Sequence, residues 1–433
     1  MLKTQTDNPN YLAKVVNLPE ISKHPHADRL QVVRIDFQNV ITGLDAKEGD
    51  LYVYFPLECQ INKAFMKFSN GFSDKGKNAD NTKGGFFNKH ARVKATRLRS
   101  VLSEGYIHPV ANVNEWLKDA GIKYQITDKD AGSEFDSFGD TLFVNKYVVP
   151  TKGNGGTPKN KQAARATKLV DDQFRVHADT AQLKRNMFKI EPEDIVSISY
   201  KIHGCNATFA NVLCKKPLKL YEKVLKKVGV NIVDTQYDDV FSSRRVIKNA
   251  YADKVQDSFY TFDVWTEAAK RLEGKIKPGI SLYCELAGQM PGGSWIQPDY
   301  DYGMLPNEFG IWAFRITYTS IDGSVMEFTK PQIAAYCEKY DIPLSPQFYY
   351  GKAKDIYPDI KIDEQWHENV LERLKTQYNE KNCYMCSNKV PEEGVVVRKE
   401  GEAFEAYKLK SEKFLSRETA ELDKGTVNIE DET

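Results

Sequence analysis

The first candidate for chemistry is a lysine in the stretch SYKIHGCNATF (199–209). Lys201 ends a mostly apolar run, IVSISYK, and Gly204 follows it three residues later. Strand alternation places Lys201 at the end of a polar face that includes Ser197 and Ser199. An ordinary solvent-facing lysine would give the same pattern, so this stretch alone does not assign a function.

A second group of cations lies in the segment EAYKLK near the C-terminus. The two-residue period of a strand puts Lys408 and Lys410 on one side and Tyr407 and Leu409 on the other. Two ammonium groups about 7 Å apart repel each other unless an anion lies between or over them, and phosphate is a natural counter-ion. Alternatively, these lysines lie on an exposed edge strand, where their charges prevent pairing with the strand of another chain.

These lysines belong to the second of two expected domains. Short alternating runs predict a β-rich domain over residues 1–150, a small antiparallel barrel or sandwich. Residues 151–168 are rich in glycine and basic residues and are expected to form a linker. Strands and helices mix without regular alternation over 169–415, which predicts an α+β domain of antiparallel sheets flanked by helices. The acidic residues 416–433 are expected to be a frayed tail.

The period of the apolar residues predicts the elements of the second domain. The expected strands are IVSISYK, SFYTFDVW, ISLYCELAG, FGIWAFRITY, EGVVVRKE and FEAYKLK. The expected helices are PLKLYEKVLKKV, PQIAAYCEKY and DEQWHENVLERLKTQYNEK.

The composition is that of a soluble globular protein, with 433 residues, 41% hydrophobic and 28% charged. No apolar run is long enough to span a bilayer, and the N-terminal MLKTQTDNPNYLAK lacks the apolar core of a secretion signal, so we expect a cytoplasmic location. The net charge of +1 excludes a chain-wide attraction to nucleic acid but leaves local basic patches possible. Cys383 and Cys386 have the spacing of a metal pair without a second pair, so we expect free thiols.

Five segments, in order and with similar spacing, resemble the motifs of covalent nucleotidyltransferases and most closely those of the RNA ligase 2 family. They are KIHG (201–204), CELAG (284–288), WAF (312–314), EEGVVVR (392–398) and YKLK (407–410). The resemblance implies a nucleotidyltransferase domain with an ATP-grasp-like adenylation fold. It also implies an ATP-dependent RNA ligase that joins 3′-hydroxyl and 5′-phosphate RNA ends through a lysyl-AMP and an RNA-adenylate, with Mg²⁺ or Mn²⁺.

The resemblance implies that Lys201 is the nucleophile that attacks the α-phosphate of ATP. Such a lysine must lose its proton, which desolvation and the positive charge of Lys408, Lys410 and the metal favour. The same cations would neutralise the transition state. Gly204 would let the chain turn beside the nucleotide where a Cβ would intrude. His203, where the wider superfamily has aspartate, is expected to position rather than to bind metal.

Further site residues follow from the same resemblance. Glu285 is expected to accept a hydrogen bond from a ribose hydroxyl, and Phe314 to stack on adenine. Glu393 is expected to hold the catalytic metal, and Arg398 to hold the β- and γ-phosphates or to orient pyrophosphate.

Two segments outside the five motifs also carry candidates. In FSSRRVIKN (241–249) an arginine is expected to contact the phosphate of AMP or the RNA end; Arg244 is our choice, and Arg245 stays open. The segment FRVHADTAQLKRN (174–186) is expected to contact the RNA end or the nucleotide, with a solvated helix face as the alternative. Its candidates are Arg175, His177, Lys184 and Arg185.

The first domain resembles the OB-fold tRNA-binding module that is appended to some synthetases. The resemblance rests on KHPHADRLQVVRID (23–36), EGDLYVYFP (48–56) and RVKATRLRSVLSEGY (92–106). It implies an OB-fold nucleic-acid-binding domain, and an OB domain before a ligase core is the layout of one family of RNA ligases. The residues expected to bind RNA are Lys89, Arg92, Lys94, Arg97 and Arg99, beside Phe86 and Phe87. A solvated barrel edge is the alternative.

Two other functions compete with this one. DNA ligases and mRNA-capping enzymes share the lysine chemistry, but they normally carry an OB domain after the last lysine motif, and we expect none after Lys410 in this sequence. A non-catalytic RNA-binding protein with a relic ligase core would not need a full set of catalytic residues. The set here comprises Lys201, Glu285, Glu393, Lys408 and Lys410. We therefore expect an RNA-sealing enzyme that acts as a monomer on RNA and does not bind a membrane.

Overall fold

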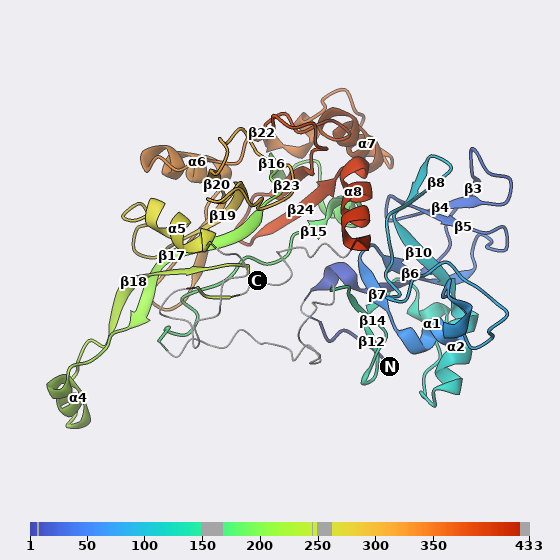
Figure 1. Ribbon diagram of the computed structural model, residues 1–433, viewed down its shortest axis with the longest axis horizontal. Coiled ribbons are helices and arrows are strands. Elements are labelled where there is room, and N and C mark those ends of the chain that lie inside the picture. Colours follow the sequence, from blue (N-terminus) through green and yellow to red (C-terminus); the bar gives the residue numbers. More distant parts are fainter. Residues whose placement is uncertain (7, 149–167, 245, 249–261, 425–433) are drawn as a thin grey trace. The chain divides into compact units, whose positions relative to one another are not determined.

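The computed structural model describes residues 1–6, 8–148, 168–244, 246–248 and 262–424 (Figure 1). The expected linker lies outside the described residues except for Lys168. The chain divides into two compact units. The first comprises Met1–Pro150, Ala181–Phe188 and Glu412–Thr426, and the second comprises Thr151–Thr180, Lys189–Ser411 and Val427–Thr433.

The first unit consists of short antiparallel strands and four helices among its described residues. Pairing gives the orders β10-β6-β2-β11, β3-β4-β5, β1-β12-β13, β14-β7 and β8-β9. The strands are β1 (Leu2–Lys3), β2 (Ala13–Asn17), β3 (Ile21–Lys23), β4 (Gln31–Ile35), β5 (Gln38–Thr42), β6 (Leu51–Pro56), β7 (Cys59–Ile61), β8 (Thr96–Leu98), β9 (Val101–Ser103), β10 (Gly105–Pro109), β11 (Glu134–Phe135), β12 (Ser137–Phe138), β13 (Thr141–Leu142), β14 (Val144–Lys146) and β15 (Ala181–Gln182). The helices are α1 (Lys63–Phe68), α2 (Val110–Asp119), α3 (Leu183–Asn186) and α8 (Glu412–Asp423).

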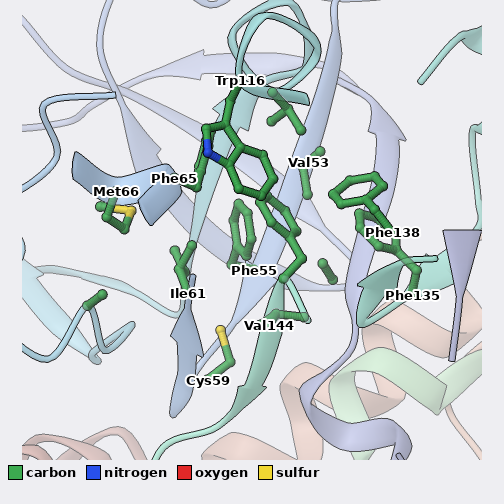
Figure 2. Close-up of a cluster of buried hydrophobic side chains, with 14 of the residues drawn as sticks. Val53, Phe55, Cys59, Ile61, Phe65, Met66, Trp116, Phe135, Phe138 and Val144 are labelled. Carbon is green, nitrogen blue, oxygen red and sulfur yellow. The ribbon is translucent and has the colours of Figure 1, made fainter. Parts of the chain in front are cut away.

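The expected barrel does not close among the described residues of this unit, because its strands pair in separate sheets. Aromatic side chains fill the core instead (Figure 2). Trp116 of α2 meets the ring of Phe65 edge-on, with 5.5 Å between the centroids. Phe65 belongs to α1, whereas Val53 and Phe135 of the same cluster belong to β6 and β11, so side chains of both helices and strands form the core.

The second half of the basic run RVKATRLRSV begins a hairpin that spans residues 96–103. Strands β8 and β9 pair with each other in the register Leu98↔Val101. Arg99 and Ser100 turn the chain at positive φ angles of 46° and 75°. Two consecutive residues at positive φ make the tight turn that matches the twist of a hairpin.

The second unit contains two antiparallel sheets, ordered β18-β17-β19-β20-β21 and β24-β23-β16-β22. Its strands are β16 (Ile195–Lys201), β17 (Cys205–Lys215), β18 (Thr235–Ser242), β19 (Ile280–Gly288), β20 (Phe309–Thr319), β21 (Val325–Glu327), β22 (Gln347–Lys352), β23 (Gly394–Lys399) and β24 (Glu405–Lys410). Its helices are α4 (Leu220–Lys227), α5 (Val264–Arg271), α6 (Lys330–Lys339) and α7 (Trp366–Tyr378). The predicted α+β class with antiparallel sheets is confirmed.

Two predicted elements are wrong. The segment SFYTFDVW (258–265) was expected to be a strand, but its last two residues begin helix α5. Asp263 caps this helix by accepting hydrogen bonds from the backbone N–H groups of Trp265 and Thr266. Residues 258–261 of the segment lie outside the described part of the chain. The expected frayed tail begins inside α8, which buries Phe414 and Leu415. In the described part of the chain, no helix is long and apolar enough to cross a membrane.

Candidate active site

The site begins at a row of three paired residues on neighbouring strands: Lys201 of β16, Gly394 of β23 and Lys410 of β24. Directly paired residues point to the same face, so the two lysine side chains flank a residue that has no side chain. Gly394 has a φ of 139°, and a Cβ there would lie 1.9 Å from the carbonyl oxygen of Leu409. The glycine is therefore required by the close approach of β24.

Glu393, the residue before this glycine, places a buried carboxylate among the cations. Its Oε1 lies 3.0 Å from Lys201 Nζ and 3.8 Å from Lys410 Nζ. Its Oε2 lies 3.7 Å from His203 Nδ1, and this oxygen has no hydrogen-bond partner among the described residues. A buried carboxylate oxygen without a donor is unfavourable, which makes it a candidate for a cation that the chain does not supply.

Two more rows of paired residues continue this side of the sheet, which forms one wall of the site. Ser199, Val396 and Lys408 form the next row, and Ser197, Arg398 and Ala406 the one after it. Ser197 lies four residues from Lys201, or about 13 Å along the strand. The wall therefore has a lysine end, at Lys201, and an arginine end, at Arg398.

The opposite wall comes from the other sheet of this unit. Glu285 of β19 is buried, and its Oε1 accepts a hydrogen bond of 3.1 Å from the backbone N–H of Gly204. A Cβ on Gly204 would lie 2.1 Å from the carbonyl oxygen of Leu286, so β19, rather than a nucleotide, is what demands this glycine. The backbone N–H of His203 donates to the hydroxyl of Tyr302 at 2.6 Å.

Phe314 stands at a β-bulge in this wall. Tyr283 pairs with Arg315 and Cys284 with Ala313, so Phe314 has no partner in the ladder. A bulge re-aims the side chain that it carries and is common beside active sites. The ring of His177 meets the Phe314 ring edge-on, with 4.9 Å between the centroids.

The two walls border a cavity of about 110 Å³. Its lining includes five Lys or Arg residues but only two Asp or Glu residues, which favours an anionic ligand. The cations are Lys201, Arg244, Lys330, Arg398 and Lys408, and the carboxylates are Asp179 and Glu285. Arg244 forms an ion pair with Asp179, and its rival Arg245 lies outside the described residues.

The comparisons with known proteins agree with this site. A model of the RNA ligase family matches residues 194–413, just over half of the 433-residue chain. The chain belongs to the RNA ligase family. The matched RNA ligase region contains both walls of the cavity except for the segment of His177 and Asp179.

Solved structures share the fold of this RNA ligase chain. A Naegleria gruberi RNA ligase with AMP and Mn has a TM-score of 0.57 and 15% identity, covering 94% of this chain and 98% of that one. The same ligase with ATP and Mn has a TM-score of 0.58 and 14% identity, covering 96% and 99%. With PPi it has a TM-score of 0.57 and 15% identity, covering 95% and 99%. No curated protein matches the sequence.

Arg398 is buried and lines the cavity. Its Nη2 donates to the carbonyl oxygen of Phe328 at 2.7 Å, and Glu327 and Glu400 each lie 3.7 Å from the guanidinium. Its Nε and Nη1 have no hydrogen-bond partner among the described residues, and the residue lies at the end of the wall away from Lys201. Its contact with the β- and γ-phosphates or with pyrophosphate stays a prediction.

The segment 174–186 divides between the two units. His177 and Asp179 line the cavity, whereas Arg175 is exposed and donates to the carbonyl oxygen of Gly323 at 3.1 Å. Lys184 is buried in the first unit, where Nζ donates to both carboxylate oxygens of Glu104 at 2.6 and 2.7 Å. This ion pair withdraws Lys184 from the expected RNA contacts.

The basic residues of the β8–β9 region also differ in accessibility. Arg92 has a side chain that is only 1% exposed, and it lies 3.1 Å from a carboxylate oxygen of Asp423. Lys94 pairs with the same carboxylate at 2.8 Å, and Arg97 pairs with Glu412 at 3.0 Å. Lys89 and Arg99 are exposed, as is Phe86, whereas Phe87 is buried.

The most informative residue that sequence reasoning missed is Lys330, which lines the cavity from the first turn of α6. Burial and the neighbouring Arg398 lower the pKa of Lys330 to about 8. One sequence signal was available: a lysine beside Pro331 at the start of a helix opposes the helix dipole, which disfavours cations there. Asp179 and Phe404 were also missed, although Asp179 lies in the segment 174–186 and Phe404 begins the predicted strand FEAYKLK.

Proposed function

We propose that this RNA ligase is ATP-dependent and seals RNA ends that carry a 3′-hydroxyl and a 5′-phosphate. The observation that carries the proposal is the convergence of Lys201, Glu393 and Lys410 at one end of a cationic cavity. A lysine beside a carboxylate and a second ammonium suits nucleophilic attack on a phosphate ester. The Naegleria structures with AMP and with ATP support the choice of nucleotide.

The pose of the nucleotide follows from the polarity of the cavity. With the α-phosphate at Lys201, the ribose lies near Glu285, and the base lies against Phe314 toward the Arg398 end. Lys201 forms the N–P bond as the free amine and releases pyrophosphate, and Glu393, 3.0 Å away, is the nearest carboxylate that can take its proton. Lys408 and Lys410 stabilise the negative charge on the phosphate.

Two steps follow adenylation of the lysine. The AMP is transferred from Lys201 to the RNA 5′-phosphate, and the RNA 3′-hydroxyl then attacks this phosphate, which seals the strand and releases AMP.

The chain also fits a divalent metal such as Mg²⁺ or Mn²⁺. Glu393 Oε2 is a buried oxygen with no hydrogen-bond partner among the described residues, at the lysine end of the cavity. Among all residues that the structure describes, no cluster of three or more His, Cys, Asp or Glu side chains could hold a metal ion by itself. Mg²⁺ is commonly held by one or two carboxylates together with substrate phosphates, and it would neutralise phosphate charge there.

For the first unit we propose an OB-like role in holding RNA. Lys89 and Arg99 are exposed beside the exposed ring of Phe86, the combination of charge and stacking surface that single strands bind. Arg175, which is exposed in the second unit, is a further candidate for the RNA end. Arg244 stays a candidate because it lines the cavity, although it also pairs with Asp179. Arg92, Lys94, Arg97 and Lys184 drop out of this set because carboxylates already neutralise them.

The test is transfer of label from α-labelled ATP to the protein in the presence of Mg²⁺, followed by denaturing electrophoresis. We expect ATP, and not GTP, to label the wild-type protein. The control variant Lys361→Met replaces an exposed lysine with methionine, and it should be labelled like the wild type. We expect no label on Lys201→Met. A pair of RNA ends with 5′-phosphate and 3′-hydroxyl should then be sealed only by the proteins that label.

Equal labelling of the wild type and Lys201→Met would show that another residue is the nucleophile and would reject the proposal. An absence of label on the wild type, with RNA binding intact, would favour the non-catalytic RNA-binding protein.

A further inference from the structure

Lys330 is a buried cation that lines the cavity. Only 2% of the residue is exposed, and Nζ donates one hydrogen bond, of 3.1 Å, to the carbonyl oxygen of Phe314. Among the described residues, no carboxylate oxygen lies within 4.0 Å of Nζ, the distance that defines the ion pairs found elsewhere in the chain. Glu400 is nearby, but its Oε2 accepts from the backbone N–H of Lys330. Burying such a charge is unfavourable unless a partner completes it.

The position of Lys330 places this donor at the end of the cavity farthest from the nucleophile. Glu400 bonds the Lys330 backbone at 3.2 Å and the Ser197 hydroxyl at 2.6 Å. Ser197 is four residues from Lys201 along β16, or about 13 Å. Lys330 thus lies beyond the phosphate and ribose positions, where the base of a bound nucleotide would end.

The acceptor of the Lys330 bond completes a two-point pattern. Phe314 is the bulged residue of β20, and its carbonyl oxygen has a second lone pair besides the one that Lys330 uses. An acceptor and a donor therefore lie side by side. Adenine presents the complementary pair, the N6 amino donor beside the N1 acceptor, on the edge farthest from the ribose. Guanine presents the reverse pair, the O6 acceptor beside the N1–H donor.

We propose that Lys330 is a specificity-determining residue that selects adenine, with Nζ donating to N1 while the Phe314 carbonyl oxygen accepts from the N6 amino group. This inference rests on the proposed use of ATP, and it adds the contacts that read the base. The alternative is that Lys330 only satisfies the bulged carbonyl and holds α6 in place.

The first test uses the wild-type protein and two ATP analogues, 1-deaza-ATP and 7-deaza-ATP, each of which lacks one ring nitrogen. We expect the single-turnover rate of protein labelling, divided by the nucleotide concentration for half-maximal rate, to fall about 10- to 100-fold with 1-deaza-ATP, as for a lost hydrogen bond to a charged group. We expect little change with 7-deaza-ATP. A larger loss of labelling rate with 7-deaza-ATP than with 1-deaza-ATP would overturn the proposal, and so would equal rates with ATP and 1-deaza-ATP.

The second test adds Lys330→Met, with Lys339→Met at the exposed end of the same helix as the matched control. We expect Lys330→Met to reduce the labelling rate with ATP by the same factor by which 1-deaza-ATP reduces the labelling rate of the wild type. The variant should also label at equal rates with ATP and with 1-deaza-ATP. Lys339→Met should behave as the wild type. If Lys330→Met slows both nucleotides equally, Lys330 has only a structural role.

Binding of AMP and 1-deaza-AMP, measured by calorimetry, separates this inference from the proposed function. If the wild type is never labelled but binds AMP at least 10-fold more tightly than 1-deaza-AMP, the ligase mechanism fails and the base-reading role stands. If it is labelled but binds both nucleotides equally, the mechanism stands and the role of Lys330 is rejected. If it neither labels nor binds AMP, both fail.

Discussion

Basic side chains meet different surroundings in the two units. In the first unit, Lys184 is buried against Glu104, and Arg92 and Lys94 share the carboxylate of Asp423. In the second unit, five Lys or Arg side chains line one cavity, although Lys201, Arg244 and Arg398 each also meet a carboxylate. A cluster of basic residues in the sequence therefore does not identify a binding site by itself. The two cases differ because the cations of the second unit converge on one cavity, where no carboxylate of the described residues lies within 4.0 Å of the Lys330 ammonium.

Buried lysines make the contrast sharpest. Both oxygens of the Glu104 carboxylate accept from Lys184 Nζ, so this charge is compensated within the protein. Among the described residues, the Lys330 ammonium donates to the carbonyl oxygen of Phe314 and has no carboxylate oxygen within 4.0 Å. The first arrangement contributes to the stability of the folded unit, whereas the second leaves a donor that a ligand can use.

The largest expected effect is at the lysine end of the cavity. Lys201→Arg keeps the positive charge, but a guanidinium cannot lose its proton to become a nucleophile. We expect complete loss of labelling from ATP, whereas Arg92→Lys in the first unit should leave labelling unchanged. Labelled Lys201→Arg would contradict the assignment of Lys201.

The next effect concerns the stability of the first unit. Glu104→Gln leaves the Lys184 ammonium buried without a counter-charge, so we expect the free energy of unfolding to fall by about 3–5 kcal/mol. The control is Asp140→Asn, which breaks the exposed pair with Lys3 and should cost less than about 1 kcal/mol. Urea titration followed by fluorescence measures both. Equal small losses would mean that the buried pair does not stabilise the unit.

A third effect is the pH dependence that Lys330 imposes on stability. Its pKa is about 8 in the folded protein, below the ordinary 10.5 of the unfolded chain. Between these values the unfolded state binds more protons, so stability rises with pH through this window, and the full cost of about 3 kcal/mol is present below pH 8. We expect Lys330→Met to lose this slope between pH 8 and 10.5, whereas Lys339→Met keeps it. Urea titrations at several pH values measure it, and an unchanged slope would show that another group titrates.

The smallest expected effect is on RNA affinity. Arg99→Ala should weaken binding of a single-stranded RNA about three- to ten-fold and reduce its salt dependence by one phosphate contact. Lys94→Ala should change affinity little, because Lys94 already pairs with Asp423. Fluorescence anisotropy at several salt concentrations compares them. Equal losses would show that an internal ion pair does not withdraw a lysine from RNA.

Much of the second unit could be predicted from its sequence. The strands around Lys201, Glu285, Phe314, Glu393 and Lys408 were predicted because each alternates or is continuously apolar, and such patterns are local. The turn at Arg99 and Ser100 was missed because neither residue signals positive φ. Helix α8 was missed because its acidic composition hides two buried residues, Phe414 and Leu415.

The sequence by itself determined which residues share a strand face. It placed Lys408 and Lys410 on one side of β24, because the two-residue period of a strand depends only on neighbouring residues. Only the tertiary structure decided which charges are compensated. Glu104 meets Lys184, Asp423 meets Arg92, and the Phe314 carbonyl oxygen meets Lys330. These partners come from distant parts of the chain, and long-range packing sets their distances.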